Sequence, residues 1–545
     1  MGRRSERPTC GIVAAAVAAA LAACALLLPS CASGEATVLP LAGGEAAVSE
    51  DGAASEAESG GATEAKASDD PEDPGDAEAS AADLDEADEG ASPEGLEPTG
   101  DELAARMDAY LAANFPRAGA PGLAVAVVDA GGVRYLRTFG DCPDADAPFV
   151  VGSLSKSFTA VAVMQLVEQG AVDLDAPASR YAPGYDVPDE VTVRSLLNQT
   201  SGFGAYDSLA EAADGELGET FGAFSYANAN YDLLGRVVEG ASGEDYARYL
   251  DEHVLEPLGM VPGHRDWFGL PVADGFRHAQ GDGAWGGPAS GYVASSVRDM
   301  ASYLRMYLNG GMGGDGARVL SADSVRRMFL DRVPDPEGDT YYGMGWTSFS
   351  WDDGELVLSH DGQVENYTAS MCLLPERGIG IVALSDANDN AGGNIRFFDL
   401  VGGVVSVAIG GTGQPMDDAW TWAWRQRVDV LYASALLLAV SPLLLTGRWR
   451  RRLSAACRGG VAPIVRARSL RMLLVRGVLL HVALPACILA LPFVWGVPWR
   501  DLLTFSPDVS TVLLASAGLL VVAGAVRLAA AVTLRNDEPP PSIMR

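Results

Sequence analysis

The sequence predicts an α+β fold in which one antiparallel sheet, assembled from both ends of a globular region, carries an inserted helical lobe. Three observations predict it. A β-hairpin pattern lies near the start of the region, at residues 122–139. A helix-rich and loop-rich stretch follows from about residue 173 to 338, and four strand-like runs lie between residues 342 and 384.

The individual elements rest on periodicity and on turn residues. Residues 101–114 have apolar side chains at helical spacing and acidic residues in the first turn, which predicts a helix. The hairpin strands are joined by Asp129-Ala130-Gly131-Gly132, which is typical of a tight turn. The remaining expected elements are a strong helix at 153–169, strands at 355–359, 369–374 and 379–384, and a closing helix at 394–409.

The first hundred residues divide into two segments. Residues 1–31 resemble a targeting signal, because three arginines precede an apolar run at 11–29. Cleavage before Cys24 in a lipoprotein-like box, a poorer box at Cys31, and an uncleaved anchor all remain open. Residues 32–100 form an acidic linker, which we expect to be disordered because it cannot bury enough apolar surface to offset its chain entropy.

The C-terminal part predicts a membrane anchor. Three apolar spans lie at 428–446, 473–497 and 510–532, and an arginine-rich loop at 448–471 separates the first two. The positive-inside rule places that loop in the cytoplasm. The expected location is therefore a multi-pass protein of the cell membrane whose globular region, 101–412, is extracytoplasmic. His481 is interpreted as a packed histidine rather than a proton relay.

Composition excludes several classes of ligand. A formal net charge of −34 argues against nucleic-acid binding, which needs clustered lysine and arginine. The seven cysteines include no Cys-x-x-Cys pair and the five histidines form no His-Glu-x-x-His motif, so we expect no metal and no cofactor. Cys142 and Cys372 could form a disulfide, but buried free thiols are the favoured interpretation.

The strongest chemical signal is a lysine. The chain has 38 basic residues, of which only Lys66, in the acidic linker, and Lys156 are lysines. Arginine keeps its proton in proteins, whereas a desolvated lysine can become a free amine, so Lys156 suggests a task that arginine cannot perform. It belongs to Ser153-Leu154-Ser155-Lys156, and residues three apart share one face of a helix. Ser153 at the start of that helix is therefore a candidate nucleophile.

The chain also resembles a known family. The segment 149–160 is similar to the nucleophile region of the serine beta-lactamase and penicillin-binding protein superfamily, especially its class C-like serine hydrolases. Tyr226-Ala227-Asn228 resembles the family's Tyr-x-Asn motif, and His360-Asp361-Gly362 resembles the His-x-Gly form of its third motif. Further stretches match in the expected order over about residues 103–410: 191–202, 256–260, 291–301 and 342–346.

The resemblance implies a role for each motif residue. Ser153 would attack a substrate carbonyl and form an acyl-enzyme, while Lys156 and Tyr226 share the proton transfers, with Tyr226 as phenolate or as relay. We expect the Lys156 ammonium to lower the pKa of Tyr226, burial to lower the pKa of Lys156, and the two groups to titrate as a unit. Asn228 would orient the lysine or the substrate. The backbone N–H groups of Ser153 and Gln363 would form the oxyanion hole.

Two departures from the family pattern bear on substrate. The third motif carries His360 before Gly362, where true beta-lactamases usually have a permanently charged lysine that helps to hold a carboxylate. Related proteins also commonly have histidine at the position of Gln199. The sequence therefore predicts a membrane-anchored serine hydrolase, an esterase or D-amino-acid peptidase rather than an efficient beta-lactamase. Its partners would be the membrane and a small-molecule or peptidoglycan-type substrate. A penicillin-binding protein that acylates without efficient turnover is the alternative.

Overall fold

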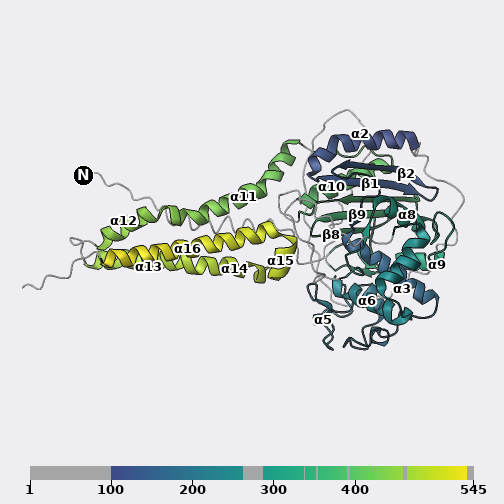
Figure 1. Cartoon of the computed structure of the whole chain (residues 1–545), viewed down its shortest axis with the longest axis horizontal. Coiled ribbons are helices and arrows are strands. Elements are labelled where there is room, and N and C mark those ends of the chain that lie inside the picture. The colour runs from purple at the N-terminus through teal and green to yellow at the C-terminus, as the bar shows by residue number, and fades with distance from the viewer. Residues whose placement is uncertain are drawn as a thin grey trace, which may run out of the picture.

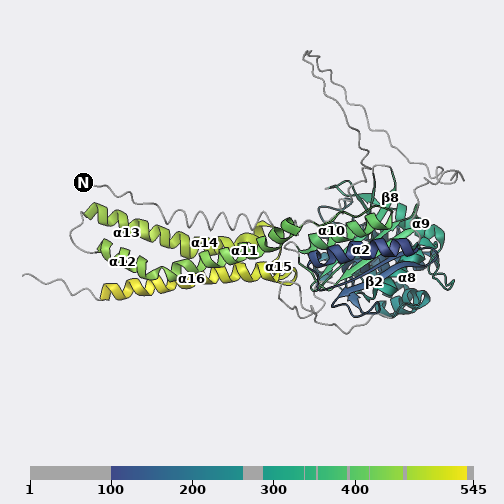
Figure 2. The ribbon, with the colours of Figure 1, turned by 90° about the horizontal axis from the view of Figure 1, so that it is seen from above.

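The computed structural model describes residues 100–261, 287–336, 338–351, 354–389, 393–416, 418–457 and 463–536. Within these residues a globular unit is followed by a long helical bundle that extends from one side of it (Figures 1 and 2). The expected targeting segment and the acidic linker, apart from Gly100, lie outside the described residues.

An antiparallel sheet of eight strands forms the centre of the globular unit, in the order β2-β1-β10-β9-β8-β7-β6-β5. β1 pairs with β10 from Leu123 opposite Ser385 to Asp129 opposite Ile379, which joins the two ends of the unit in one sheet. The expected α+β fold is therefore confirmed. The strands are β1 (Gly122–Asp129), β2 (Val133–Gly140), β5 (Val333–Pro334), β6 (Tyr341–Gly343), β7 (Trp346–Ser350), β8 (Leu356–Val364), β9 (Tyr367–Leu374) and β10 (Ile379–Ser385).

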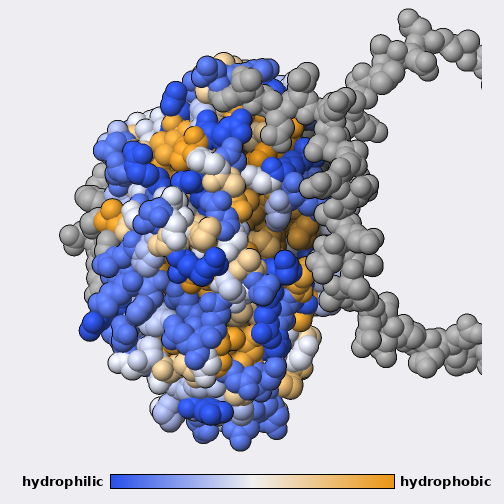
Figure 3. Space-filling view, turned by 90° about the vertical axis from the view of Figure 1, so that its right-hand side faces the viewer, coloured by the Kyte–Doolittle hydropathy of each residue, from blue (hydrophilic) through white to orange (hydrophobic). Residues whose placement is uncertain are grey.

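Both faces of the sheet are covered. Helices α2 (Gly100–Ala118) and α10 (Gly393–Ala408) pack together on one face, and the helical lobe covers the other (Figure 1). Successive side chains of a strand point to opposite faces. Val125 and Val127 of β1 accordingly join the core beneath α2 and α10, whereas Ala124 and Ala126 join the core of the helical lobe. The outer surface away from the bundle is mostly hydrophilic, with apolar residues in small separate groups (Figure 3).

The helical lobe is built around α3, which is buried along most of its length. The strong helix expected at 153–169 is present, but it begins at Ser155, after a 3-10 turn at Gly152–Leu154. Several helices begin at a Ser or Thr whose side chain accepts a backbone N–H, as N-caps do; these are Thr192, Ser208, Ser296 and Ser321. The helices are α3 (Ser155–Glu168), α4 (Val193–Leu197), α5 (Leu209–Ala212), α6 (Asn228–Ser242), α7 (Tyr246–Leu250), α8 (Val297–Leu308) and α9 (Ala322–Leu330). A small sheet joins β3 (Phe149–Val150) to β4 (Ala294–Ser295). Short helical turns cover Ala178–Arg180, Asp251–Leu255 and Glu256–Leu258.

The C-terminal bundle contains two helices long and apolar enough to cross a membrane, at Ala467–Val494 and Pro507–Thr533. A third crossing results only if Val428–Leu444 and Thr446–Cys457, which meet at a bend of 43°, count as one span. The expected arginine-rich loop is instead largely helical, because arginine is a good helix former. The bundle helices are α11 (Asp418–Leu444), α12 (Thr446–Cys457), α13 (Pro463–Val478), a π-helical turn (Leu479–Ala483), α14 (Leu484–Val494), α15 (Trp499–Phe505) and α16 (Pro507–Asn536).

Two smaller expectations are settled by packing. Cys142 and Cys372 are both free and buried, so the free-thiol interpretation is confirmed. His481 is buried between helices, with Nδ1 2.7 Å from the Leu520 carbonyl oxygen and Nε2 3.1 Å from the Arg527 guanidinium. This is the packed histidine that the sequence predicted. Arg527 also donates to the Pro442 carbonyl oxygen at 2.7 Å, so it links α16 to α11.

Candidate active site

The turn that carries Ser153 is pressed against strand β8 at backbone contact. Gly152 has φ +59°, and a Cβ atom at this position would lie 2.5 Å from the Gln363 amide nitrogen. On the strand, a Cβ atom at Gly362 would overlap the Val151 carbonyl oxygen. Only glycine at both crossing points allows this approach. The structure therefore brings Ser153 next to Gly362 of the third motif and to Gln363, whose N–H group is predicted to join that of Ser153 in the oxyanion hole.

Lys156 lies at the centre of the site with no exposed surface. Its Nζ atom is 3.1 Å from Ser153 Oγ, 2.7 Å from Asn228 Oδ1 and 2.7 Å from the Ser290 carbonyl oxygen. It also lies 4.7 Å from the centre of the Tyr226 ring. The structure thus joins the first two sequence motifs around one amine. Burial lowers the pKa of Lys156 to about 7, although the Asp232 carboxylate acts in the opposite direction.

The three contacts of Lys156 determine what its free amine can do. A neutral amine keeps two hydrogens and one lone pair. Asn228 Oδ1 and the Ser290 carbonyl oxygen are acceptors only, so they take the two hydrogens. The lone pair is then left for the third neighbour, Ser153 Oγ, which can donate its hydroxyl hydrogen. In this arrangement the neutral lysine is oriented to accept the serine proton.

Tyr226 has the opposite shift in pKa from the one we expected. Burial raises its pKa well above 10, as does the neighbouring Tyr342, and a hydrogen bond with Ser153 opposes this only in part. The Lys156 ammonium does not offset the burial, so the expected lowering is wrong. Tyr226 stays a neutral phenol at physiological pH. It can relay a proton between neighbours, but it is not a standing phenolate base.

His360 is buried and uncharged. Its Nδ1 lies 2.9 Å from the Asp361 carbonyl oxygen, so Nδ1 carries the hydrogen, and Nε2 faces the Tyr342 hydroxyl at 3.4 Å. Burial and the Lys156 charge lower the pKa of His360 to about 3, and the hydrogen bond with Asp361 opposes them only in part. The third motif therefore provides no positive charge to the site at neutral pH.

Gln199 performs a task that the sequence alone did not disclose. Its backbone has φ +58°, an unusual conformation for a residue other than glycine, and its side chain is fully buried. The Gln199 Oε1 atom accepts from the Ala227 amide at 3.0 Å and from the Asn230 side chain, while the Gln199 carbonyl accepts from the Ser225 amide at 2.8 Å. Gln199 thus fixes the backbone on both sides of Tyr226. The one signal that pointed to it was its departure from the family pattern.

A cluster of possible metal ligands lies elsewhere in the helical lobe. Glu244, Glu252 and His253 bring ligand atoms within 4.8 Å of one another. Glu252 forms an ion pair with Arg248 at 2.7 Å, and His253 Nε2 lies 3.3 Å from Glu244. These contacts account for the cluster as partly exposed ion pairing around α7.

Comparison with known proteins identifies the family. The family described as Beta-lactamase matches residues 101–399. Penicillin-binding protein 4 of Amycolatopsis lactamdurans is 30% identical over 308 residues, which cover 48% of this chain and 79% of the relative. Protein flp of Staphylococcus aureus strain MW2 is 24% identical over 323 residues, covering 52% of this chain and 63% of the relative. The structure of the octameric penicillin-binding protein homologue from Pyrococcus abyssi shares 24% identity and a TM-score of 0.48, covering 59% of this chain and 80% of that one.

The family match and the similarity to Penicillin-binding protein 4 define the class of the protein. The chain belongs to the Beta-lactamase family, a family of serine hydrolases that includes penicillin-binding proteins. The resemblance drawn from the sequence motifs is therefore confirmed. The C-terminal helical bundle lies outside the matched residues.

Proposed function

We propose that the protein is a membrane-anchored, extracytoplasmic serine hydrolase that acts through a Ser153 acyl-enzyme on an ester or a D-amino-acid peptide or amide at the cell envelope. One observation carries this proposal. The buried Lys156 amine lies 3.1 Å from Ser153 Oγ, and its two other contacts are carbonyl oxygens that leave its lone pair for the serine.

The chemical steps follow from this geometry. Lys156 Nζ takes the hydroxyl proton as Ser153 Oγ bonds to the substrate carbonyl carbon. The negative charge that develops on the carbonyl oxygen is stabilised by the N–H groups of Ser153 and Gln363. The proton then passes from Lys156 through the Tyr226 phenol to the departing alkoxide or amine as the acyl–heteroatom bond breaks. Water then attacks the acyl carbon and gives up a proton to the same pair of groups, Lys156 and Tyr226. The proton returns to Ser153 Oγ as the acyl–Oγ bond breaks, which releases the acid and restores the Ser153 hydroxyl.

The charge of the site supports an ester or amide substrate over a beta-lactam. A beta-lactam presents a carboxylate, which a permanent positive charge in the third motif helps to hold. His360 stays neutral at any pH well above about 3, so this site lacks that charge. Slow beta-lactam hydrolysis with faster turnover of uncharged esters or D-amino-acid amides is the expected profile.

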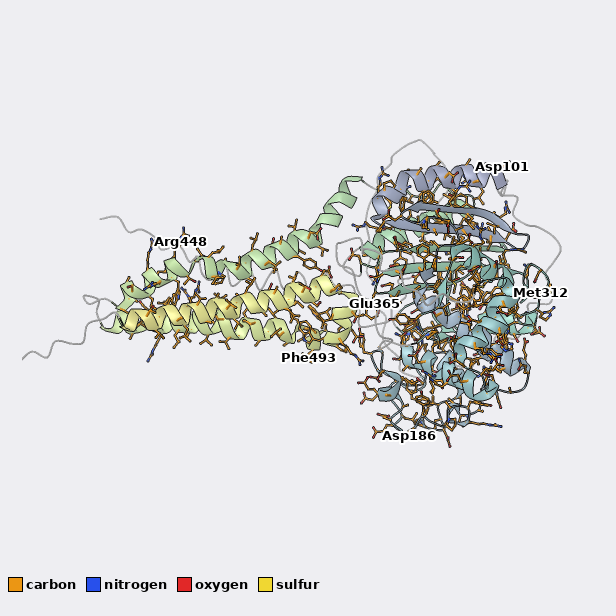
Figure 4. All side chains as sticks on the ribbon, viewed as in Figure 1. Asp101, Asp186, Met312, Glu365, Arg448 and Phe493 are labelled. Carbon is orange, nitrogen blue, oxygen red and sulfur yellow. The ribbon has the colours of Figure 1, made fainter. Side chains whose placement is uncertain are left out.

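The contact between the globular unit and the bundle supports anchoring close to the site. The Arg500 guanidinium on α15 donates to the Tyr206 carbonyl oxygen, just before α5, and lies 3.4 Å from the Glu211 carboxylate on α5. Glu365, in the turn after β8, lies on the side of the globular unit nearest the bundle (Figure 4). This arrangement would hold the catalytic unit at the extracytoplasmic surface of the cell membrane.

The test uses the full-length protein in detergent and its Ser153→Ala variant. A fluorescent fluorophosphonate and a fluorescent penicillin measure acylation, while p-nitrophenyl acetate and D-alanine p-nitroanilide measure turnover. Labelling and turnover that both depend on Ser153 support the hydrolase. Labelling without turnover of either substrate would favour a penicillin-binding protein that acylates and stalls. Absence of Ser153-dependent labelling by either probe would refute the proposed nucleophile.

A further inference from the structure

A carboxylate that the proposed mechanism does not use lies beside its central amine. Asp232 follows Asn228 by one turn of α6, and residues four apart lie on the same face of a helix. Asn228 contacts Lys156 directly. Asp232 is therefore directed to the same side of the helix, and its charge acts on Lys156. Neither the Tyr-x-Asn motif nor the family comparison assigns it a role.

Asp232 holds the segment that supplies one of the acceptors of Lys156. Its Oδ1 atom accepts from the Gly287 amide at 3.0 Å, and the Ser290 hydroxyl also forms a hydrogen bond with it. Residues 287–290 form a turn in which the Ser290 amide donates to the Gly287 carbonyl at 3.2 Å. The Asp232 carboxylate thus fixes both ends of the turn. The carbonyl oxygen of Ser290, the last residue of the turn, accepts a hydrogen bond from Lys156 at 2.7 Å.

We propose that Asp232 is a positioning residue of this site, which fixes the Ser290 carbonyl against Lys156 and supplies the negative charge that balances the lysine ammonium after it accepts the serine proton. The inference rests on the proposed function of Ser153 and Lys156. It adds a charge and a tether that lie outside the Ser-x-x-Lys, Tyr-x-Asn and His-x-Gly motifs.

The surroundings of Lys156 make this charge effective. Among the described residues, the ionisable groups that face the amine are Tyr226, Tyr231 at 5.8 Å from ring centre to Nζ, His360 and Asp232. Burial raises the pKa of both tyrosines and lowers that of His360, so these three stay neutral at pH 7. Asp232 is then the group that can offset a buried ammonium by its charge.

Asp232 has other electrostatic neighbours of its own. Burial raises its pKa, while the Gly287 and Ser290 hydrogen bonds, Lys156 and Arg236 act in the opposite direction. Arg236 lies one turn further along α6, forms a 2.7 Å ion pair with Glu239 and also acts on the Asp232 carboxylate. The Arg236 side chain is 49% exposed, so solvent and salt screen its interaction with Asp232 more than they screen that of the fully buried Lys156.

The experiment separates the tether from the charge. Asp232→Asn keeps a side-chain oxygen that can accept from the Gly287 amide, but it removes the negative charge. Asp232→Ala removes both. The control is Asp299→Asn on α8, which neutralises another buried carboxylate that accepts a loop amide, from Val261 at 3.3 Å, away from the candidate site.

The readout is the rate of fluorophosphonate labelling of Ser153 in the full-length protein from pH 5 to pH 9, with thermal unfolding as a check of folding. We expect Asp232→Asn to move the pH midpoint of labelling downward by about 0.5 to 1 unit, because an ammonium without its counter-charge loses its proton more readily. The plateau rate should fall by about 3- to 10-fold, because the amine is a weaker base. Asp232→Ala should show the same shift and a further loss, and Asp299→Asn should match the wild type.

An unchanged midpoint in a folded Asp232→Asn protein would overturn the proposal, because Asp232 would then hold the turn and nothing more. Equal behaviour of the Asp232→Asn and Asp299→Asn variants would overturn it in the same way. Failure of the wild-type protein to label at Ser153 would instead refute the proposed function, so the two failures are distinguishable.

Discussion

Replacing Lys156 by arginine tests the central chemistry, because it keeps a positive charge and removes the ability to accept a proton. With a pKa of about 7, roughly half of the lysines are free amines at pH 7, about a tenth at pH 6 and about nine tenths at pH 8. Arginine has a pKa above about 12, so fewer than about one in 10⁴ is deprotonated at pH 8. General base catalysis contributes about 10²- to 10⁴-fold. We therefore expect acylation of Ser153 to fall by about 10³-fold.

The assay is the rate of fluorophosphonate labelling of the full-length protein at pH 8. Lys156→Met is the control for the bulk of arginine, because it removes the amine without enlarging the side chain. It should be equally inactive. The folded-state pKa of Lys156 is lowered, so the folded state binds fewer protons than the unfolded state between about pH 7 and 10.5, and wild-type stability should rise with pH across that window. The Met variant should lack this rise. Labelling of Lys156→Arg within about tenfold of the wild-type rate would refute the reasoning.

Three further predictions concern groups around the site. Gln199→Ala should lower the free energy of unfolding by about 1–3 kcal/mol, measured by urea titration, because the Ala227 amide loses its buried acceptor. It should also lower kcat more than it raises KM. Burial raises the pKa of Asp361 to about 7, so the contribution of Asp361 to the free energy of unfolding falls as pH rises from about 4 through 7. The Asp361→Asn variant should therefore be more stable than the wild type at pH 8 and not at pH 5, as measured by thermal unfolding. Burial raises the pKa of Cys142 to about 11 and that of Cys372 to about 12, so maleimide should label both, by mass spectrometry, only after denaturation.

The sequence predicted the fold best where periodicity is long. Helix α2 and the β1–β2 hairpin follow directly from apolar spacing and a glycine turn. The two-residue strands β3 and β4 are too short to show a period, and they depend on contacts far apart in the chain. Ser153 was placed in the first turn of the helix but lies in a preceding 3-10 turn, because the left-handed conformation of Gly152 cannot be read from its identity alone.

The site was predictable where motifs supply side chains and not where the backbone or burial decides. The spacing of Ser153 and Lys156 predicted that they share a face, and they lie in contact. The Ser290 carbonyl could not be found, because a backbone acceptor leaves no signature in the residue type. The pKa of Tyr226 was predicted in the wrong direction, since its sign depends on how deeply the phenol is buried.

The structure places two opposing demands on Lys156 and meets both with neutral neighbours and one carboxylate. To accept the serine proton, the amine must be free at physiological pH, and complete burial provides this by disfavouring the ammonium. To keep that proton until it passes to the leaving group, the ammonium must still be tolerated. Asn228 Oδ1, the Ser290 carbonyl oxygen and the Asp232 charge provide that tolerance. A general base works best when its pKa lies near the working pH, and about 7 is where these effects balance. Under the proposed mechanism, arginine at this position could satisfy the second demand and never the first, which would explain why a globular region that otherwise relies on arginine keeps a lysine here.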